Sequence, residues 1–483
     1  MKQLLLFLTC FLCLQQTIAQ YTLIPDPNFE QALIDLGIDS EGTLDGQFLT
    51  ADAANITLLD IDNKNINSLT GIEAFIDLEW LDAFDNNLTS LDLSLITSPN
   101  LWTLRVSNND LIEIDLSHIP SIVNLSLGSN NFTSIDASNL DFLFSLSVSN
   151  NPLTSINLTN CDSLQSLVLV NTLLENVDLS DCILLYDINV HDSQVATLDF
   201  SNNQEIVMVR TYNTPLTNIN LPNNPDLEYL ALDDTLLTEL DITHCPGLIE
   251  INFWNTPLNH IDFSNNPLIE KIQGNNSSLT TINVDNNPNL EWLILRNNNI
   301  EGSLSFLNNP YLDEVNLDEN LIQELDFSNN SLITFVIIGG NPNLELVNMK
   351  NGGNQNLLFF DGLNCPQFSC LVVDDPNAAN DDIFVDANTT LVGSVEECEN
   401  LAINEETLQD NISIYPNPVQ DVLNINTNSI EINKIEIYDV LGKKVLVKNG
   451  TISQLDISSL DSGLYLVNIQ TDQGVLFKKV VKE

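Results

Sequence analysis

Hydrophobic residues recur along the middle of the chain with a period of 21 residues. Each copy reads L-x-x-L-x-L-x-x-N-x-L, in which x is any residue and related residues replace some of the letters. Copies begin at Leu101, Ile122, Leu143, Leu164, Leu185, Ile206, Leu227, Leu248, Ile269 and Leu290. Looser copies begin at Ile56, Leu78 and Leu312, and the pattern degrades after Leu332. A period held for so long predicts a stack of similar structural units.

Positions within one repeat predict how each unit folds. Positions 4 and 6 are apolar and two residues apart, as inward side chains of one short strand must be. Positions 3, 5 and 7 should then point outward from a concave parallel sheet. Position 9 carries short polar side chains that can bond the backbone of a buried turn. Its occupants are Asn86, Asn109, Asn130, Asn151, Thr172, Ser193, Thr214, Thr235, Thr256 and Asn298. With 21 residues a repeat has little room for a helix, so its convex side should be extended or turn-like.

A stack of repeats exposes apolar surface at its ends and needs caps. Before the first repeat, the stretch IPDPNFEQALIDLG predicts a short helix with Asp26 as N-cap and Gly37 at its end. Phe29, Leu33 and Leu36 should share the face that covers the first repeat.

The repeat residues resemble leucine-rich repeats over residues 56–373. This resemblance implies a mainly β, right-handed leucine-rich repeat solenoid with a short N-terminal helical cap at 21–55. The stretch from CPQFSCLVVDD to VEEC resembles the C-terminal caps of exported leucine-rich repeat proteins of Bacteroidetes. The resemblance implies a cap at 374–398 in which Cys370 and Cys398 form a disulfide.

The last part of the chain has a different pattern. After an acidic linker at 399–411, apolar and polar residues alternate over 412–483 with breaks at Pro, Gly and DQG, which predicts a small antiparallel β-sandwich. YPNP at 415–418, IYDVLGKKV, LDSGLY and the basic pair Lys478-Lys479 resemble the C-terminal sorting domain of the type IX secretion system. The resemblance implies the type IX secretion machinery as a partner, and release or anchoring at the outer cell surface.

Residues 1–20 have the features of a secretory signal peptide: Lys2, the apolar run LLLFLTCFLCL and a small residue, Ala19, before the cleavage point. No later apolar run is long enough to span a bilayer. We therefore expect export through the periplasm, no membrane span, and a secreted or outer-surface location.

The charge and the histidines narrow the classes of function. A formal net charge of −53 argues against nucleic acid and anionic membranes as partners. The four histidines show neither metal-ligand spacing nor a nucleophile motif. We expect no enzyme activity, no catalytic residues, no metal site and no cofactor. Position 15 is mostly aspartate, which indicates either a solvated acidic face or calcium held between repeats.

Four further cysteines occupy position 19, where several other repeats have asparagine. They are Cys161, Cys182, Cys245 and Cys365. The exchange with asparagine predicts inward sites with buried thiols. Cys161 and Cys182 lie on neighbouring repeats, and whether they are bonded stays open at this point.

The outward positions suggest a binding surface. From Leu101 to Val170 column 7 is plain, whereas from Leu185 onward the outward columns carry aromatic and charged side chains. Trp, Tyr and Arg are enriched in binding hot spots. The expected ligand-binding residues are His191, Arg210, Tyr212, Tyr229, Asp233, Trp254, Lys271, Trp292 and Arg296. The alternative is that aromatic residues are there because they favour strands.

These patterns together predict a secreted or cell-surface binding protein. Its concave face would recognise a protein partner, as an adhesin or adaptor does. Two alternatives remain: a glycan partner, since an aromatic face can stack on a sugar ring, or a structural matrix scaffold.

Overall fold

The computed structural model describes residues 20–96, 98–378, 381–398, 408–409, 411–428, 430–450, 452–471 and 474–483. The predicted signal peptide, apart from Gln20, and most of the predicted linker lie outside the described residues. Contacts divide the chain into two units. The first comprises residues 1–301, 308–320 and 335–337, and the second comprises residues 302–307, 321–334 and 338–483.

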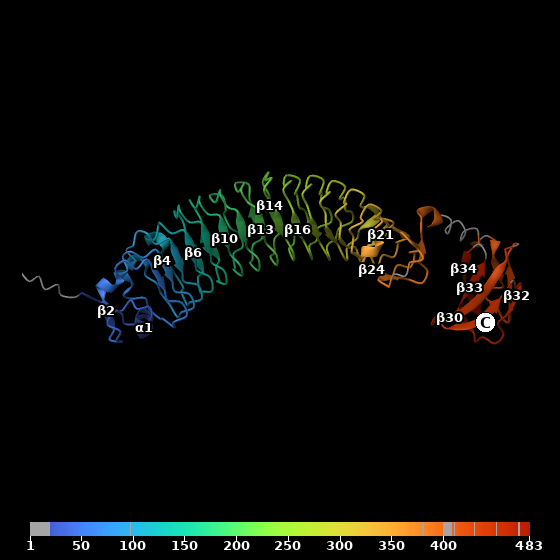
Figure 1. Ribbon diagram of the computed structural model, residues 1–483, viewed down its shortest axis with the longest axis horizontal. Coiled ribbons are helices and arrows are strands. Elements are labelled where there is room, and N and C mark those ends of the chain that lie inside the picture. The colour runs from blue at the N-terminus through green and yellow to red at the C-terminus, as the bar shows by residue number, and fades with distance from the viewer. Residues whose placement is uncertain are drawn as a thin grey trace, which may run out of the picture. The chain divides into compact units, whose positions relative to one another are not determined.

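The first unit is a solenoid in which each repeat contributes one short strand to a parallel main sheet (Figure 1). The strands, in spatial order, are β3 (Leu58–Asp60), β4 (Trp80–Asp82), β5 (Thr103–Arg105), β6 (Asn124–Ser126), β8 (Ser145–Ser147), β10 (Ser166–Val168), β11 (Asp187–Asn189), β13 (Met208–Arg210), β15 (Tyr229–Ala231), β16 (Glu250–Asn252), β17 (Lys271–Gln273), β18 (Trp292–Ile294), β20 (Glu314–Asn316) and β22 (Phe335–Ile337). Residues 21 apart pair directly, as Ser166 does with Asp187. The fold predicted from the period is confirmed.

Each strand of the main sheet covers positions 3 to 5 of its repeat. In β10, for example, Leu167 is buried while Ser166 and Val168 are partly exposed. Position 6 is buried as well, as Leu169 shows. The inward and outward positions are therefore those that the sequence pattern predicts.

The opposite side of the solenoid consists mostly of turns. Short strands pair there in two places, β7 (Ser134–Asp136) with β9 (Ser155–Asn157) and β12 (Thr197–Asp199) with β14 (Asn218–Asn220). Single 3-10 turns occur at η2 (Ile72–Ala74), η3 (Leu93–Leu95) and η4 (Leu116–His118). The expected extended and turn-like side is confirmed.

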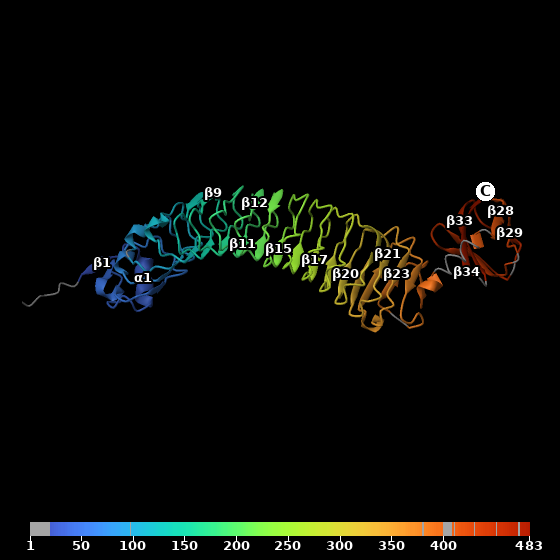
Figure 2. The ribbon, with the colours of Figure 1, turned by 90° about the horizontal axis from the view of Figure 1, so that it is seen from above.

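The N-terminal cap contains α1 (Pro27–Asp35), β1 (Tyr21–Leu23), β2 (Gln47–Leu49) and η1 (Thr50–Ala53). Figure 2 shows α1 and β1 at the start of the solenoid. The Asp26 carboxylate accepts the backbone N–H groups of Asn28 and Phe29 at 2.9 and 3.2 Å, so it is the predicted N-cap. Phe29 and Leu33 are buried, but Leu36 is 47 % exposed, and its expected place on the buried face is wrong. Leu36 is the C-cap residue after the helix ends at Asp35, and it keeps a helical backbone with its N–H bonded to Ala32 O, but it is not covered there.

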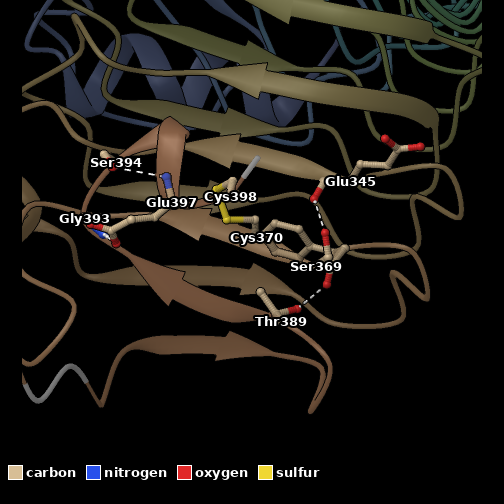
Figure 3. Close-up of a disulfide and its surroundings, with 9 residues drawn as sticks. Glu345, Ser369, Cys370, Thr389, Gly393, Ser394, Glu397 and Cys398 are labelled. Carbon is tan, nitrogen blue, oxygen red and sulfur yellow. Dashed lines mark hydrogen bonds between the residues drawn. A yellow bond between two sulfur atoms is a disulfide. The ribbon is translucent and has the colours of Figure 1, made fainter. Parts of the chain in front are cut away.

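The second unit contains further parallel strands. One sheet has the order β19 (Glu301–Ser305), β21 (Leu321–Asp326), β23 (Leu346–Asn348), β25 (Cys370–Val372) and β27 (Thr390–Val392). β24 (Phe359–Gly362) pairs with β26 (Ile383–Val385), and the turn η5 (Asn354–Asn356) precedes them. Cys370 in β25 forms a disulfide with Cys398, with a Cα–Cα distance of 5.8 Å, as the resemblance implied (Figure 3).

Residues 412–483 contain two antiparallel sheets. One has the order β28 (Ser413–Tyr415), β29 (Val422–Asn426), β32 (Gln454–Asp456). The other has the order β31 (Lys444–Asn449), β30 (Ile432–Asp439), β33 (Gly463–Thr471), β34 (Gly474–Lys482). Leu423, Ile435 and Val467 belong to one buried cluster that joins both sheets. The predicted β-sandwich is therefore present.

Candidate binding face of the main sheet

The predicted site residues lie on the outward face of the main sheet, over the repeats from β11 to β18. Arg210, Tyr229, Lys271 and Trp292 are strand residues at positions 3 or 5. The remaining five occupy position 7, two residues after the end of the strand, and are His191, Tyr212, Asp233, Trp254 and Arg296. All nine are partly or substantially exposed.

Each basic residue of this face is paired with an acid on an adjacent repeat. Arg210 Nη1 lies 2.6 Å from Asp187 Oδ1, and Lys271 Nζ lies 3.6 Å from Glu250 Oε2. Arg296 contacts two acids, Asp318 at 3.0 Å and Glu319 at 2.9 Å. Such partly exposed pairs contribute little to folding stability, roughly 0–1 kcal/mol each. Their effect is to hold the long side chains in one orientation.

The aromatic residues are also held by neighbours. The His191 and Tyr212 rings stack with centroids 4.2 Å apart and an interplanar angle of 11°. Lys271 Nζ lies 4.6 Å from the centre of the Trp292 ring. Arg210 Cζ lies 5.7 Å from the centre of the Tyr229 ring. The structure thus brings six of the predicted residues together in three pairs.

Trp254 and Asp233 form the remaining link. The Trp254 backbone N–H donates to Asp233 Oδ1 at 2.9 Å, while the indole itself is 41 % exposed. Burial raises the pKa of the Asp233 carboxyl, and the hydrogen bond from Trp254 only partly offsets this shift. Trp254 therefore presents a large apolar side chain from a backbone position that is held in place.

Position 8 determines how position 7 is presented, and the sequence analysis missed it. The residues at position 8 have a left-handed backbone conformation. They are Asn108, Ser129, Asn150, Asn171, Asp192, Asn213, Asp234, Asn255, Asn276 and Asn297. Neighbouring members bond to one another, as Asn255 Nδ2 does with Asp234 Oδ1 at 2.8 Å and Asn276 Nδ2 with Asn255 Oδ1 at 2.9 Å. The signal was visible, because Asn and Asp tolerate positive φ better than other side chains.

The aspartates of position 15 are used by the turns of the opposite side. Asp262 Oδ1 accepts the Ser264 N–H at 2.9 Å, and Asp199 does the same for Ser201 at 3.0 Å. These hydrogen bonds lower the pKa of both carboxyls. Asn220, which interrupts the acidic row, donates to Asp199 at 2.8 Å. The column therefore has a structural role in local turns, and the described residues include no group of three or more His, Cys, Asp or Glu that could hold a metal ion.

The cysteines of position 19 are buried. Cys161 and Cys182, whose pairing the sequence left open, are separate thiols, and Cys245 is a free thiol too. Burial raises the pKa of Cys161 and Cys245 to about 11 and that of Cys182 to about 12. Thiols in this state are poor nucleophiles, so they act as small core side chains.

Residues 413–483 match the family described as the secretion system C-terminal sorting domain. The chain carries a type IX sorting domain. This domain directs the protein to the cell surface or the extracellular space. No helix in the described part of the chain is long and apolar enough to cross a membrane.

Solved structures similar to the chain are leucine-rich repeat proteins. The functional domain of InlJ from Listeria monocytogenes, described as including a cysteine ladder, is 20% identical with a TM-score of 0.66, covering 96% of this chain and 99% of that one. The internalin InlF from Listeria monocytogenes is 19% identical with a TM-score of 0.50, covering 74% and 97%. A chain of the LRIM1/APL1C complex is 20% identical with a TM-score of 0.51, covering 71% and 66%. At these identities the likeness shows the leucine-rich repeat fold alone. Comparison with curated proteins finds no match.

Proposed function

We propose that this exported leucine-rich repeat protein binds a protein partner through the outward face of the main sheet over β11 to β18. The observation that carries the proposal is Trp254, an indole that is 41 % exposed and fixed through its backbone to Asp233. Exposed tryptophans in ordered surroundings are typical centres of binding hot spots. The protein would act in adhesion or as an adaptor.

The ion pairs on the repeats around Trp254 favour a protein as the partner. Arg210 and Lys271 are oriented before any partner arrives, so binding would cost little side-chain entropy. An acid accompanies each of these cations, and Asp233 adds another carboxyl. The face therefore offers both charges around an apolar centre, which suits a mixed polar and apolar protein surface.

The alternatives are less well supported at this face. A glycan would need free ring faces, but Lys271 lies over the Trp292 ring, and His191 covers Tyr212. A catalytic role is not proposed, because leucine-rich repeat solenoids are typical interaction scaffolds. A matrix scaffold relying on the acidic column is disfavoured because those aspartates serve turns.

The test begins with a photo-crosslinking amino acid placed at Gln273, a partly exposed residue of β17 on the repeat after that of Trp254, in the secreted full chain. The captured protein is then used as the ligand for binding measurements. Trp254→Ala and Arg210→Ala should each weaken its binding by about 2 kcal/mol or more, as truncation of a hot-spot residue does. Melting temperatures should barely change, because both side chains point away from the core.

Ser149→Ala is the matched control on a plain repeat of column 7. No hydrogen bond joins the Ser149 hydroxyl to any described residue, so its removal should leave both binding and stability unchanged. If Trp254→Ala lowered the melting temperature and left the affinity intact, Trp254 would be a structural residue and the proposal would be wrong.

A further inference from the structure

A second surface runs across the repeats at the N-terminal ends of the strands of the main sheet. It consists of position 2 of each repeat, the residue just before the strand. Trp102, Phe144 and Tyr186 are 43, 44 and 44 % exposed there. We call these three residues the edge row. None of them belongs to the face proposed above. Position 7 of their repeats is Ser107, Ser149 and His191, of which only His191 belongs to that face.

Backbone hydrogen bonds align the edge row. Val123 N–H donates to Trp102 O at 2.9 Å, and Phe144 N–H donates to Val123 O at 2.8 Å. The same bonds link Phe144 to Gln165 and Gln165 to Tyr186, both at 2.9 Å. Position 2 is therefore a continuous ladder with one residue per repeat, in which Val123 and Gln165 separate the aromatic residues.

The column two residues earlier alternates in step with the edge row. Phe142 and Leu184 are 64 and 42 % exposed and stand beside Phe144 and Tyr186 in the sequence. The intervening repeats have Ser121 and Ser163 at this position. Large exposed apolar groups thus stand beside Phe144 and Tyr186 in this column, whereas Asn100 occupies the same position beside Trp102.

The length of this repeat discriminates between classes of ligand. Neighbouring parallel strands are about 4.8 Å apart, so aromatic residues two repeats apart are separated by roughly 9.6 Å. Side chains on one face of an extended peptide recur about every 6.7 Å. A helix reaches a comparable distance only after two turns, about 10.8 Å, and also presents side chains at the first turn, about 5.4 Å. A β-1,4-linked polysaccharide does fit, because it presents the same ring face at every second sugar and each sugar is about as long as one repeat is thick.

The charges around the edge row restrict the class of ligand further. The edge ladder is uncharged from Trp102 to Val207, while Glu79 precedes it and Glu228 follows it at the same position. In a chain with a net charge of −53, acidic surroundings would repel an anionic polymer. The partly exposed Asn124, Ser145 and Ser166, at the next position, can bond sugar hydroxyl groups.

We propose that the edge row binds an extended, uncharged β-1,4-linked polysaccharide that lies across the repeats from β5 to β11. Alternate sugar rings stack on Trp102, Phe144 and Tyr186. This site is separate from the face around Trp254 and does not depend on the function proposed for that face.

The experiment is affinity electrophoresis of the full secreted chain in gels containing hydroxyethyl cellulose, a soluble neutral β-1,4-glucan, or galactomannan, a neutral β-1,4-mannan. At least one should retard the protein, while anionic polygalacturonate should not. For a β-1,4-glucan, affinity for cello-oligosaccharides, followed by tryptophan fluorescence, should rise steeply from two sugars to five, the length that reaches all three rings.

Phe144→Ala should reduce the affinity for the retarding polysaccharide about tenfold, and Phe144→Trp should restore it. Leu236→Ala, which removes another exposed apolar side chain, and Trp254→Ala should leave it unchanged. The proposal is overturned if neither neutral polysaccharide retards the chain, if polygalacturonate binds equally well, or if Phe144→Ala has no effect. Loss of a protein partner in Phe144→Ala without polysaccharide binding would assign the edge row to a protein instead.

Discussion

Two stretches of the same solenoid hold their repeats together differently. In the repeats of β5 to β8, position 9 is asparagine. Asn130 Nδ2 donates to Val106 O at 3.0 Å and Leu127 O at 3.1 Å, and its Oδ1 accepts the Leu111 N–H at 3.0 Å. In the repeats of β10 to β17, position 9 is threonine or serine. Thr235 Oγ1 donates to Leu232 O of its own repeat at 2.8 Å.

In these repeats the hydrogen bonds to the neighbouring repeat are made by position 19, in the turn on the other side of the solenoid. Where position 9 is threonine or serine, position 19 is mostly asparagine. Asn266 Nδ2 donates to Ile242 O at 3.1 Å and Cys245 O at 2.7 Å, both on the preceding repeat. In the asparagine stretch, position 19 carries residues such as Leu140 and Cys161. Most repeats therefore use one buried amide to bond a neighbouring repeat, and this amide can lie in either of the two turns.

The largest expected difference between the stretches comes from removing one amide. Asn130→Ala should destabilise the solenoid by about 3 to 4 kcal/mol, since it strips bonds from three buried backbone groups. Thr235→Ala should cost only about 1 kcal/mol, because one carbonyl loses one donor. Urea denaturation followed by circular dichroism measures both.

Hydrogen exchange would locate the effect. The Leu111 amide should lose protection in Asn130→Ala, whereas the Thr235→Ala change should spread little beyond its own turn. Equal losses of stability in the two variants would show that the asparagine and the threonine at position 9 contribute equally to stability, contrary to the expectation.

The disulfide lies at the end of the repeats and provides a covalent link there. Cys370 and Cys398 are 28 residues apart, and a loop of this length predicts a stabilisation of about 3 kcal/mol from chain entropy. Replacing both by serine should lower stability by that amount and expose the cap to proteolysis. Cleavage that stays confined to interior repeats in the variant would contradict this expectation.

The smallest expected effects come from pH, and they differ in sign between two aspartates. The pKa of Asp262 is lowered by the Ser264 N–H, so its contribution is present above the unfolded pKa and is lost as the pH falls through the folded pKa. The pKa of Asp233 is raised by burial, so its ionisation opposes folding, and that penalty disappears as the pH falls.

Urea midpoints of two matched variants, compared with the parent chain between pH 7 and pH 3, would test these signs. Asp233→Asn should raise the midpoint at pH 7 and have a vanishing effect at pH 3, because asparagine keeps an acceptor for the Trp254 N–H. Asp262→Asn should lower the midpoint at pH 7 and have less effect at pH 3. If both variants shifted the urea midpoint in the same direction at pH 7, burial would not be the cause of the raised pKa of Asp233.

The sequence alone predicted the period, one short strand in each repeat around positions 4 and 6, and the inward or outward direction of each column. These follow from alternation along a strand, a local property that 21-residue spacing repeats. It also predicted that the nine residues of the candidate face point outward, and all nine are at least partly exposed. The disulfide and the sorting domain came from resemblance to known families, which the bond between Cys370 and Cys398 and the match at 413–483 confirm.

The contacts between side chains on different repeats are visible only in the folded structure. The ion pair of Arg210 with Asp187 and the cover of Lys271 over Trp292 join residues about one repeat apart, and such contacts depend on side-chain rotamers and strand register as well as spacing. The alignment of Trp102, Phe144 and Tyr186 required the backbone ladder between them. Leu36 shows the same limit at the cap, because the helical pattern puts it on the buried face but no neighbouring element covers it. A periodic sequence specifies which way a side chain points, and packing between repeats specifies what it touches.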